Sequence, residues 1–517
     1  MERDDEDFRS YRKAAEMGIA DAQNSLGVMY EEGRGVEQDD VEACRWYRKA
    51  AEQGYAPAQY NLGFAYGYGR GVEQDDTEAC RWYRKAAEQG YAPAQNDLGF
   101  AYDSGRGVEQ DDVEACRWFR EAAEQDYAPA QYNLGFAYDS GRGVSQDTVE
   151  ACRWFREAAK QGHASAQTSL GVMYEYGRGI EQDDVEACRW YRKAAEQGNA
   201  PAQYNVGTMY EYGRGVEQDD IEACCWYRKA AEQGYAPAQN DLGLMYEYGR
   251  GIEQDDVEAC RWYRKAAEQG NASAQYNMGR MYKFGRGVTQ NDTEACRWYR
   301  KAAEQGHASA QTGLGVMYEL GRGVEQNDAE ACRWYRKAAE QGDADAQFYL
   351  GIMYEDGRGV SQNVVEACRW YRRAAEQGNA SAQFHLGFMY EGGRGVEQDD
   401  VEACRWFRKA AEQGNVHAQF YLGFMYEYGQ GVEQDDTKAF QWYMKAAEQG
   451  DADAQYWVGK AYHKGRGVSS DREKALYYYK LACDAGDAEA CTMYEQVLQE
   501  KKGRKTILGG FISALRK

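Results

Sequence analysis

The stretch APAQYNLGFAYGYGRGVEQDDTEACRWYRKAAEQG, residues 56–90, contains the pattern that determines the fold of the whole chain. Its first half places Ala58, Leu62 and Tyr66 at intervals of four residues, so these side chains share one face of a helix. Gly69 follows them, at a position where helices commonly end in a left-handed residue. The first half of the stretch is therefore a predicted amphipathic helix.

The second half of the stretch has the signals of another helix. Asp75, followed three residues later by Glu78, has the spacing of an N-cap residue and its capping-box partner. The helix that they open closes at Gly90. Asp126 stands where the next unit would have this glycine, and a left-handed conformation costs an aspartate more than a glycine. Each unit is thus a predicted helix-turn-helix.

The same unit recurs along almost the entire chain. Tryptophan occurs every 36 residues without an insertion or a deletion, at positions 46, 82, 118, 154, 190, 226, 262, 298, 334, 370, 406 and 442. Cysteine keeps the same register, at positions 44, 80, 116, 152, 188, 224, 260, 296, 332, 368 and 404. Thirteen units fill residues 20–487. Because such units bury their cores only against neighbours, we predict an all-α solenoid of paired antiparallel helices.

Three shorter segments flank the repeats. Residues 1–19 match the second helix of a unit alone, and residues 488–500 match a first helix that caps the array. Residues 501–517 form a tail with six basic and no acidic side chains, and its apolar residues could share one helix face. Two alternatives remain for this tail. It folds back onto the repeats, or it docks on an anionic membrane surface or on a partner.

The composition argues against several classes of function. The 517 residues carry a net charge of −23 with a pI near 4.9, so the overall field repels nucleic acid and anionic lipid. No apolar run reaches the roughly 20 residues of a membrane helix, and the acidic N-terminus does not resemble a signal peptide. We therefore predict a cytoplasmic protein that binds no nucleic acid and contacts membranes, if at all, only through the basic tail.

Motifs of enzymes and of cofactor sites are absent from the sequence. The five histidines lack metal-ligand spacing, and no Cys-x-x-Cys pair, Walker loop or nucleophile elbow occurs. The acidic loops are interpreted as helix caps, with calcium binding as an alternative that lacks the ligand spacing of an EF-hand. The recurrent Gly-Arg-Gly is interpreted as a turn. We predict no catalytic residue, no metal and no cofactor, and an enzyme built on carboxylates and thiols is the least favoured alternative.

The repeat cysteines are predicted to be reduced and buried. Equivalent thiols of successive units lie about two helix spacings apart, roughly 16–20 Å, which is too far for a disulfide. Buried, unpaired thiols are typical of proteins in a reducing compartment. This pattern agrees with the predicted cytoplasmic location.

The pattern Ala-x-Ala-x-x-x-Leu-Gly-x-x-Tyr-x-x-Gly-x-Gly-Val, followed by Ala-x-x-Trp-Tyr-x-Lys-Ala-Ala-Glu-x-Gly, resembles the Sel1-like repeat, and residues 56–90 contain every element of it. That family resembles tetratricopeptide-repeat proteins, which implies a right-handed superhelix and a role as adaptor or scaffold for protein complexes. Cys483 and Cys491 resemble the paired cysteines of exported, cysteine-rich members. A disulfide between them is therefore an alternative, and with it a secreted or delivered regulatory protein.

Comparison of the units with one another locates the predicted binding surface. The positions of the first helix that vary lie opposite Ala58, Leu62 and Tyr66, and in the right-handed solenoid that the resemblance implies they line the concave side. We predict an exposed aromatic groove, framed by acidic side chains, that binds an extended or basic segment of a protein partner. The alternative is random variation of solvated positions. The expected contacts are Tyr60, Phe64, Tyr204, Phe348, Phe384, Phe388, Phe420 and Phe424.

Overall fold

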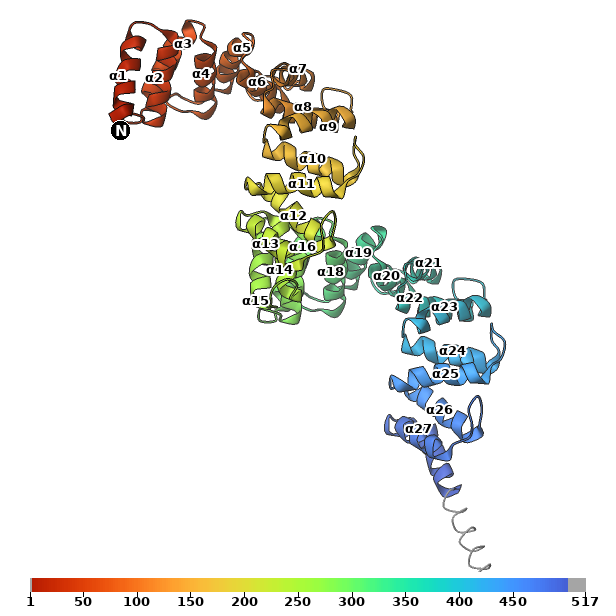
Figure 1. Cartoon of the computed structure of the whole chain (residues 1–517). Coiled ribbons are helices and arrows are strands. Elements are labelled where there is room, and N and C mark those ends of the chain that lie inside the picture. The colour runs from red at the N-terminus through yellow and green to blue at the C-terminus, as the bar shows by residue number, and fades with distance from the viewer. Residues whose placement is uncertain (1, 501–517) are drawn as a thin grey trace, which may run out of the picture. The chain divides into compact units, whose positions relative to one another are not determined.

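The computed structural model describes residues 2–500, which form α-helices joined by short turns, with no strand among them (Figure 1). The first helices of the repeats are α2 (Ala20–Glu32), α4 (Ala56–Tyr68), α6 (Ala92–Ser104), α8 (Ala128–Ser140), α10 (Ala164–Tyr176), α12 (Ala200–Tyr212), α14 (Ala236–Tyr248), α16 (Ala272–Phe284), α18 (Ala308–Leu320), α20 (Ala344–Asp356), α22 (Ala380–Glu391), α24 (Val416–Tyr428) and α26 (Ala452–Lys464).

The second helices follow in alternation, and α1 precedes the first repeat. They are α1 (Glu2–Glu16), α3 (Asp40–Glu52), α5 (Asp76–Ala87), α7 (Asp112–Ala123), α9 (Thr148–Lys160), α11 (Asp184–Glu196), α13 (Asp220–Glu232), α15 (Asp256–Glu268), α17 (Asp292–Glu304), α19 (Asp328–Glu340), α21 (Val364–Glu376), α23 (Asp400–Glu412), α25 (Asp436–Glu448) and α27 (Arg472–Asp484). Residues 488–500 are also helical. The predicted basic tail lies outside the described residues.

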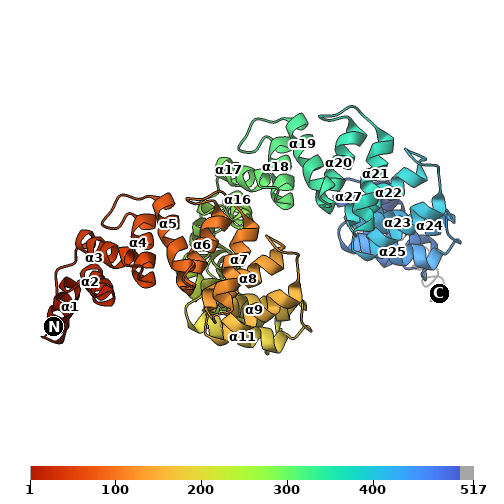
Figure 2. The ribbon, with the colours of Figure 1, turned by 90° about the horizontal axis from the view of Figure 1, so that it is seen from above.

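Consecutive helices lie side by side. Within each compact unit, a first helix packs on the second helix of its own repeat and on that of the preceding repeat, as α4 packs on α5 and on α3 and as α18 packs on α19 and on α17 (Figures 1 and 2). The contacts divide the chain into two compact units, Met1–Ala266 and Ala267–Lys517, and each unit has this architecture. The arrangement confirms the predicted all-α solenoid of paired helices.

The core of each repeat is thin and consists of small residues around one large ring. Ala58 and Leu62 of α4 are fully buried, and so is Ala86 of α5. A Cβ added to Gly63 would come within 2.8 Å of the Tyr83 ring, closer than real contacts allow. Small side chains therefore let the paired helices approach closely, and the ring fills the space that remains.

The helix ends are capped as the sequence predicts. The Asp75 carboxylate accepts hydrogen bonds from the backbone N–H groups of Thr77 and Glu78, at 2.9 and 3.0 Å, and is the N-cap of α5. Gly69 ends α4 in the left-handed region, with φ at 66°. Asp126 has φ at 60° and is the one non-glycine residue with positive φ among residues 2–500.

The Gly-Arg-Gly turn connects each repeat to the one before it. A Cβ on Gly71 would overlap the carbonyl oxygen of Asp40, at the start of the preceding second helix. The Cys80 thiol donates a hydrogen bond of 3.1 Å to the carbonyl oxygen of Arg106, in the next turn. The repeat cysteines are free and buried, as predicted, whereas the additional Cys225 is free and exposed.

A ladder of glutamine side chains, which the sequence analysis did not predict, runs through the repeats. The buried Gln59 amide donates to the carbonyl oxygen of Ala51 at 3.1 Å, and its side-chain oxygen accepts from Gln89 at 2.7 Å. In the next repeat Gln125 donates to Gln95 in the same way, at 2.7 Å. The buried Gln59 amide is therefore hydrogen-bonded through both its nitrogen and its oxygen.

A disulfide joins Cys483 of α27 to Cys491 of the helical segment 488–500, with the two Cα atoms 4.6 Å apart. The sequence left this pair open between free thiols and a bridge. On the same segment Ala490 and Val497 are fully buried in the core of the last repeats. The segment therefore covers the end of that core and is covalently attached to it.

Candidate binding face on the first helices

Six successive first helices of the first compact unit, α4 to α14, each expose one aromatic ring near their C-terminal end. The exposed fraction of these rings lies between 50% and 65%. We call the set the ring row, and its members are Tyr68, Phe100, Phe136, Tyr176, Tyr212 and Tyr248. Where the last helical residue is serine, the exposed ring lies four residues earlier, one turn before. Exposed rings at this regular interval are typical of an interaction surface.

The second compact unit has fewer such residues. Its exposed large apolar side chains at the same position are Phe284, Leu320 and Tyr428. At the equivalent position, the last residue of α20 is Asp356, and α22 is followed by Gly392. The ring row is therefore a feature of the first unit.

The rings that the sequence analysis selected as contacts are half-buried, which corrects the expectation that they are exposed. This holds for all eight, namely Tyr60, Phe64, Tyr204, Phe348, Phe384, Phe388, Phe420 and Phe424. Six of them pack against a ring of the second helix in their own repeat, with ring centroids between 5.3 and 5.9 Å apart. Helical periodicity places these residues on the outer face of the first helix, but it does not show that a ring of the second helix covers part of six of them.

The half-buried rings have two structural roles. Some support the exposed rings, since the Phe64 centroid lies 4.4 Å from that of Tyr68. Others hold adjacent repeats together, since the Tyr204 hydroxyl donates to the Asp241 carboxylate of α14 at 3.0 Å. Phe384 and Phe388 of α22 pack against the hydrophobic core of the last repeats. Replacing these rings would therefore disturb packing as well as any binding.

A buried carboxylate lies beneath the ring row in several repeats. The Tyr227 hydroxyl of α13 donates to Glu211 of α12 at 2.5 Å, and the Arg250 guanidinium of the next turn pairs with the same Glu211 at 2.8 Å. Burial, and then the hydrogen bond to Glu211, raise the pKa of Tyr227 far above its ordinary value. The residue at this position varies among the repeats, but where it is a buried glutamate its arginine partner lies 39 residues further along the chain, as in Glu175 and Arg214.

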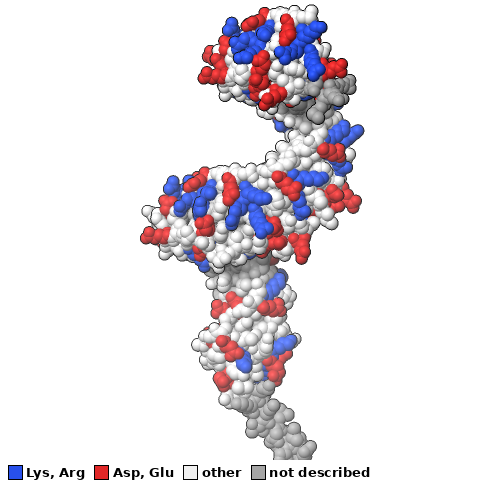
Figure 3. Space-filling view, turned by 90° about the vertical axis from the view of Figure 1, so that its left-hand side faces the viewer, with Lys and Arg blue, Asp and Glu red and all other residues white. Residues whose placement is uncertain are grey.

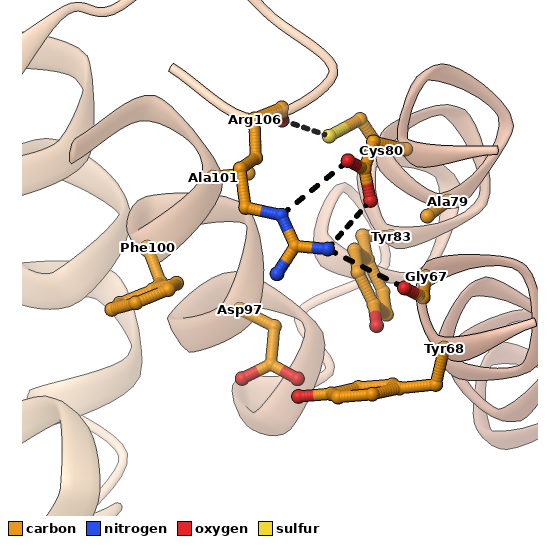
Figure 4. Close-up of a pocket in the computed structure, with 10 residues that line it drawn as sticks. Gly67, Tyr68, Ala79, Cys80, Tyr83, Asp97, Phe100, Ala101 and Arg106 are labelled. Atoms are coloured by element: carbon orange, nitrogen blue, oxygen red, sulfur yellow. Dashed lines mark hydrogen bonds and ion pairs between the residues drawn. The ribbon is translucent and has the colours of Figure 1, made fainter. Parts of the chain in front are cut away.

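Pockets open between successive first helices along this face. One, of about 100 Å³, is lined by Gly67 and Tyr68 of α4, Tyr83 of α5, and Phe100 of α6, with Arg106 above them (Figure 4). A second, of about 230 Å³, has the equivalent position one repeat later and is lined by residues that include Phe100 and Phe136. The first-helix face is therefore hollowed beneath two of its exposed rings.

Charges of both signs are interspersed on the surface. Figure 3 shows Lys and Arg next to Asp and Glu over the face that it presents. Many of these charges pair three residues apart along the second helices, as Arg81 does with Glu78 at 3.0 Å. In the described part of the chain, no group of three or more His, Cys, Asp or Glu side chains could hold a metal ion. None of the helices within residues 2–500 is long and apolar enough to cross a membrane.

Comparison with solved structures gives a similar protein of nearly the same extent. It is a protective antigen of uropathogenic Escherichia coli with an SLR fold, 38% identical in sequence, with a TM-score of 0.68. The match covers 88% of this chain and 94% of that one. A Sel1 repeat protein from Oxalobacter formigenes is 37% identical, with a TM-score of 0.47, and the match covers 63% of this chain and 92% of that one. Comparison with curated proteins gives no match.

The repeats also match a family model directly. The Sel1 repeat matches thirteen consecutive stretches of 36 residues, from 20–55 through 236–271 to 452–487, with no gap between them. These boundaries coincide with the first residue of every first helix from α2 to α26. The resemblance noted in the sequence thus holds over the entire array, and the chain belongs to the Sel1 repeat family.

Proposed function

We propose that this Sel1 repeat protein is a non-enzymatic scaffold that binds an extended segment of a partner protein along the first-helix face. The ring row is the observation that carries the proposal. Tyrosine and phenylalanine are large and lose little conformational entropy on binding, and an exposed one recurs near the C-terminal end of the first helix in six consecutive repeats. A partner that follows the repeats would meet an equivalent ring in each of them.

The charge of the protein supports a partner segment with basic residues. The net charge of −23 would increase the rate at which such a segment associates, and would repel nucleic acid. Within the second unit, the half-buried rings Phe384, Phe388, Phe420 and Phe424 form a separate set of proposed contacts. Tyr60, Phe64, Tyr204 and Phe348 complete the set of proposed contacts, and Phe64 also packs against the exposed Tyr68.

Affinity capture from the native organism with matched variants tests the proposal. The test variant replaces Tyr68, Tyr176, Tyr212 and Tyr248 by alanine. The control replaces four exposed apolar residues of the second helices, Val113, Val149, Val185 and Ile221, by alanine. A partner that binds the wild type and the control but is lost from the test variant supports the scaffold function. A partner that binds all three equally contradicts the proposed surface.

A second candidate, an exported regulatory protein, is favoured by the disulfide between Cys483 and Cys491. Disulfides persist chiefly in oxidising compartments. The similar Escherichia coli structure is that of a protective antigen. The oxidation state of Cys483 and Cys491 tests this candidate, and it is measured by mass spectrometry of protein that is alkylated immediately on lysis of the native cells. An oxidised pair recovered from an extracytoplasmic fraction favours export, and reduced thiols in the cytoplasm contradict it.

A further inference from the structure

The second repeat lacks a carboxylate that other repeats of the first unit place beneath the ring row. In the sixth repeat Glu211, the residue before the last of α12, accepts a hydrogen bond from Tyr227 at 2.5 Å and pairs with Arg250 Nη1 at 2.8 Å. In the fifth repeat Glu175 makes the same two contacts, with Tyr191 and Arg214, both at 2.6 Å. In the second repeat this position is Gly67.

The two groups that would donate hydrogen bonds to the missing carboxylate are nevertheless present around Gly67. The Tyr83 hydroxyl has no hydrogen-bond partner in the described part of the chain and points toward the pocket (Figure 4). Arg106 uses Nη2 for Asp76 at 2.7 Å and for the carbonyl oxygen of Gly67 at 3.4 Å. Its Nη1, the atom that binds the carboxylate in Arg250, has no hydrogen bond or ion pair within residues 2–500. Two donors therefore face an unfilled space.

The sequence of the first unit shows that the hydroxyl otherwise accompanies the glutamate. Where the first helix has the shorter Asp103 or Asp139, the ring of the second helix is phenylalanine, Phe119 or Phe155. Where it has glutamate, the ring is tyrosine, at residues 47, 191, 227 and 263. Tyr83 is the member of this series that keeps its hydroxyl without a carboxylate from its own chain.

The fold leaves room for a side chain at this place. A Cβ on Gly67 would lie 3.6 Å from the Tyr83 hydroxyl and 3.7 Å from the Ala79 Cβ, both ordinary contacts, and Gly67 lies within α4. The pocket of about 100 Å³ is therefore where a glutamate side chain would extend. It opens beside Tyr68 and Phe100, two exposed members of the ring row.

The acidic neighbours of the pocket do not exclude a second carboxylate. Asp97 lines it and accepts a hydrogen bond from Asn96 at 3.0 Å. The filled site has the same arrangement, since Asp241 accepts from Asn240 at 2.9 Å and also from Tyr204, while Glu211 occupies the position of Gly67. A carboxylate thus fits among these charges when tyrosine and arginine both donate to it.

We propose that the Gly67 pocket binds a glutamate side chain of the partner protein, which takes the place that Glu211 fills from within the chain. The Tyr83 hydroxyl and Arg106 Nη1 donate to the incoming carboxylate, while Tyr68 and Phe100 contact apolar residues beside it. That the carboxylate comes from a partner protein rests on the proposed function. The affinity of the pocket for a carboxylate does not.

Propionate, which is the glutamate side chain without its backbone, is the probe. Its binding to the full chain is measured by saturation-transfer NMR at constant ionic strength, with propionamide as the neutral control. We expect saturable propionate binding to the wild type, at least tenfold weaker binding to Gly67→Glu and to Tyr83→Phe, and a second site of similar affinity in Glu211→Gly. Gly67→Glu reproduces a residue found in other repeats, so its melting temperature serves as a check of folding.

Two results would overturn the carboxylate site. One is propionate binding that Gly67→Glu leaves unchanged. The other is binding that appears in Glu211→Gly but not in the wild type. The partner captured above then tests the source of the carboxylate. If Gly67→Glu retains that partner at full affinity, the assignment of a partner glutamate is wrong, but the scaffold function stands. If the ring-row variant retains the partner, the proposed binding surface is wrong, but the propionate result stands.

Discussion

Individual buried polar residues set the electrostatic character of the repeats. Asp97 is half-buried beside Tyr60 and Asn96, where burial raises the pKa of its carboxyl and hydrogen bonds from these two residues partly oppose that rise. In four other repeats the equivalent residue is asparagine, at positions 61, 133, 205 and 277. Ionised Asp97 therefore reduces the stability of a site where a neutral side chain of the same shape is accommodated elsewhere in the chain.

Replacing Asp97 by asparagine should raise the melting temperature more at pH 7 than at roughly pH 3.5, below the ordinary pKa of an aspartate. Because the pKa of Asp97 is raised on folding, the folded state binds more protons, and stability falls as pH increases between the unfolded and folded pKa values. The asparagine variant lacks this loss. The control is Asp345→Asn on an exposed site. An equal effect of Asp97→Asn at the two pH values would contradict the assignment.

Asp126 holds a backbone conformation that suits glycine. Its φ is 60°, and the equivalent Gly90 has φ at 83° with no atom within 4 Å of an added Cβ. Asp126→Gly should therefore increase the free energy of unfolding by about 1 kcal/mol, through relief of backbone strain. Gly90→Asp should lower it by a similar amount. Both are measured as shifts in melting temperature, and a destabilised Asp126→Gly would mean that its 3.4 Å contact with Gln131 outweighs the strain.

At the scale of the elements, the turn after each first helix couples neighbouring repeats. Gly215 follows α12, and a Cβ there would overlap the carbonyl oxygen of Asp184 at the start of α11. Gly198, at the end of α11, also has positive φ, 89° against 66° for Gly215, but open space around it. Alanine at Gly198 would therefore cause backbone strain alone, whereas alanine at Gly215 would cause backbone strain and a steric clash.

Gly215→Ala should cost about 3 kcal/mol, since it adds a clash with fixed backbone to an unfavourable φ. Gly198→Ala should cost about 1 kcal/mol for the backbone alone. Hydrogen exchange across α11 to α13 measures the difference where it arises, because a long array does not unfold as one unit. Equal loss of protection in the two variants would show that the contact with α11 does not stabilise the array.

The sequence predicts these elements closely because their signals are local. The Asp75 cap, the Gly69 terminus and the 36-residue period need only the order of residues along one helix. The glutamine ladder and the exposure of Tyr60 depend on side chains 23 to 30 residues away in the chain, on an adjacent helix. The sequence therefore places the candidate binding face on the first helices, but the exposure of its individual rings depends on the adjacent helix, which helical periodicity does not show.

At the scale of the whole molecule, each compact unit repeats one core, and the units differ in what they expose. The first unit has an exposed ring in six successive repeats, whereas the second has exposed apolar residues at Phe284, Leu320 and Tyr428. Uniform cores with variable surfaces suit a scaffold, because surface residues change without cost to the packing that holds the repeats together. The differences among repeats thus fall where binding is proposed.

Site-specific photocrosslinking in the native organism tests the proposed surface most directly. A photoreactive phenylalanine analogue is placed at Tyr176 or Tyr212 of the ring row, or at the exposed Val185 or Ile221 of the second helices as matched controls. The scaffold account predicts that both ring-row positions crosslink to the same partner and that the controls do not. Crosslinks confined to the second-helix positions, or equal at all four, would contradict it.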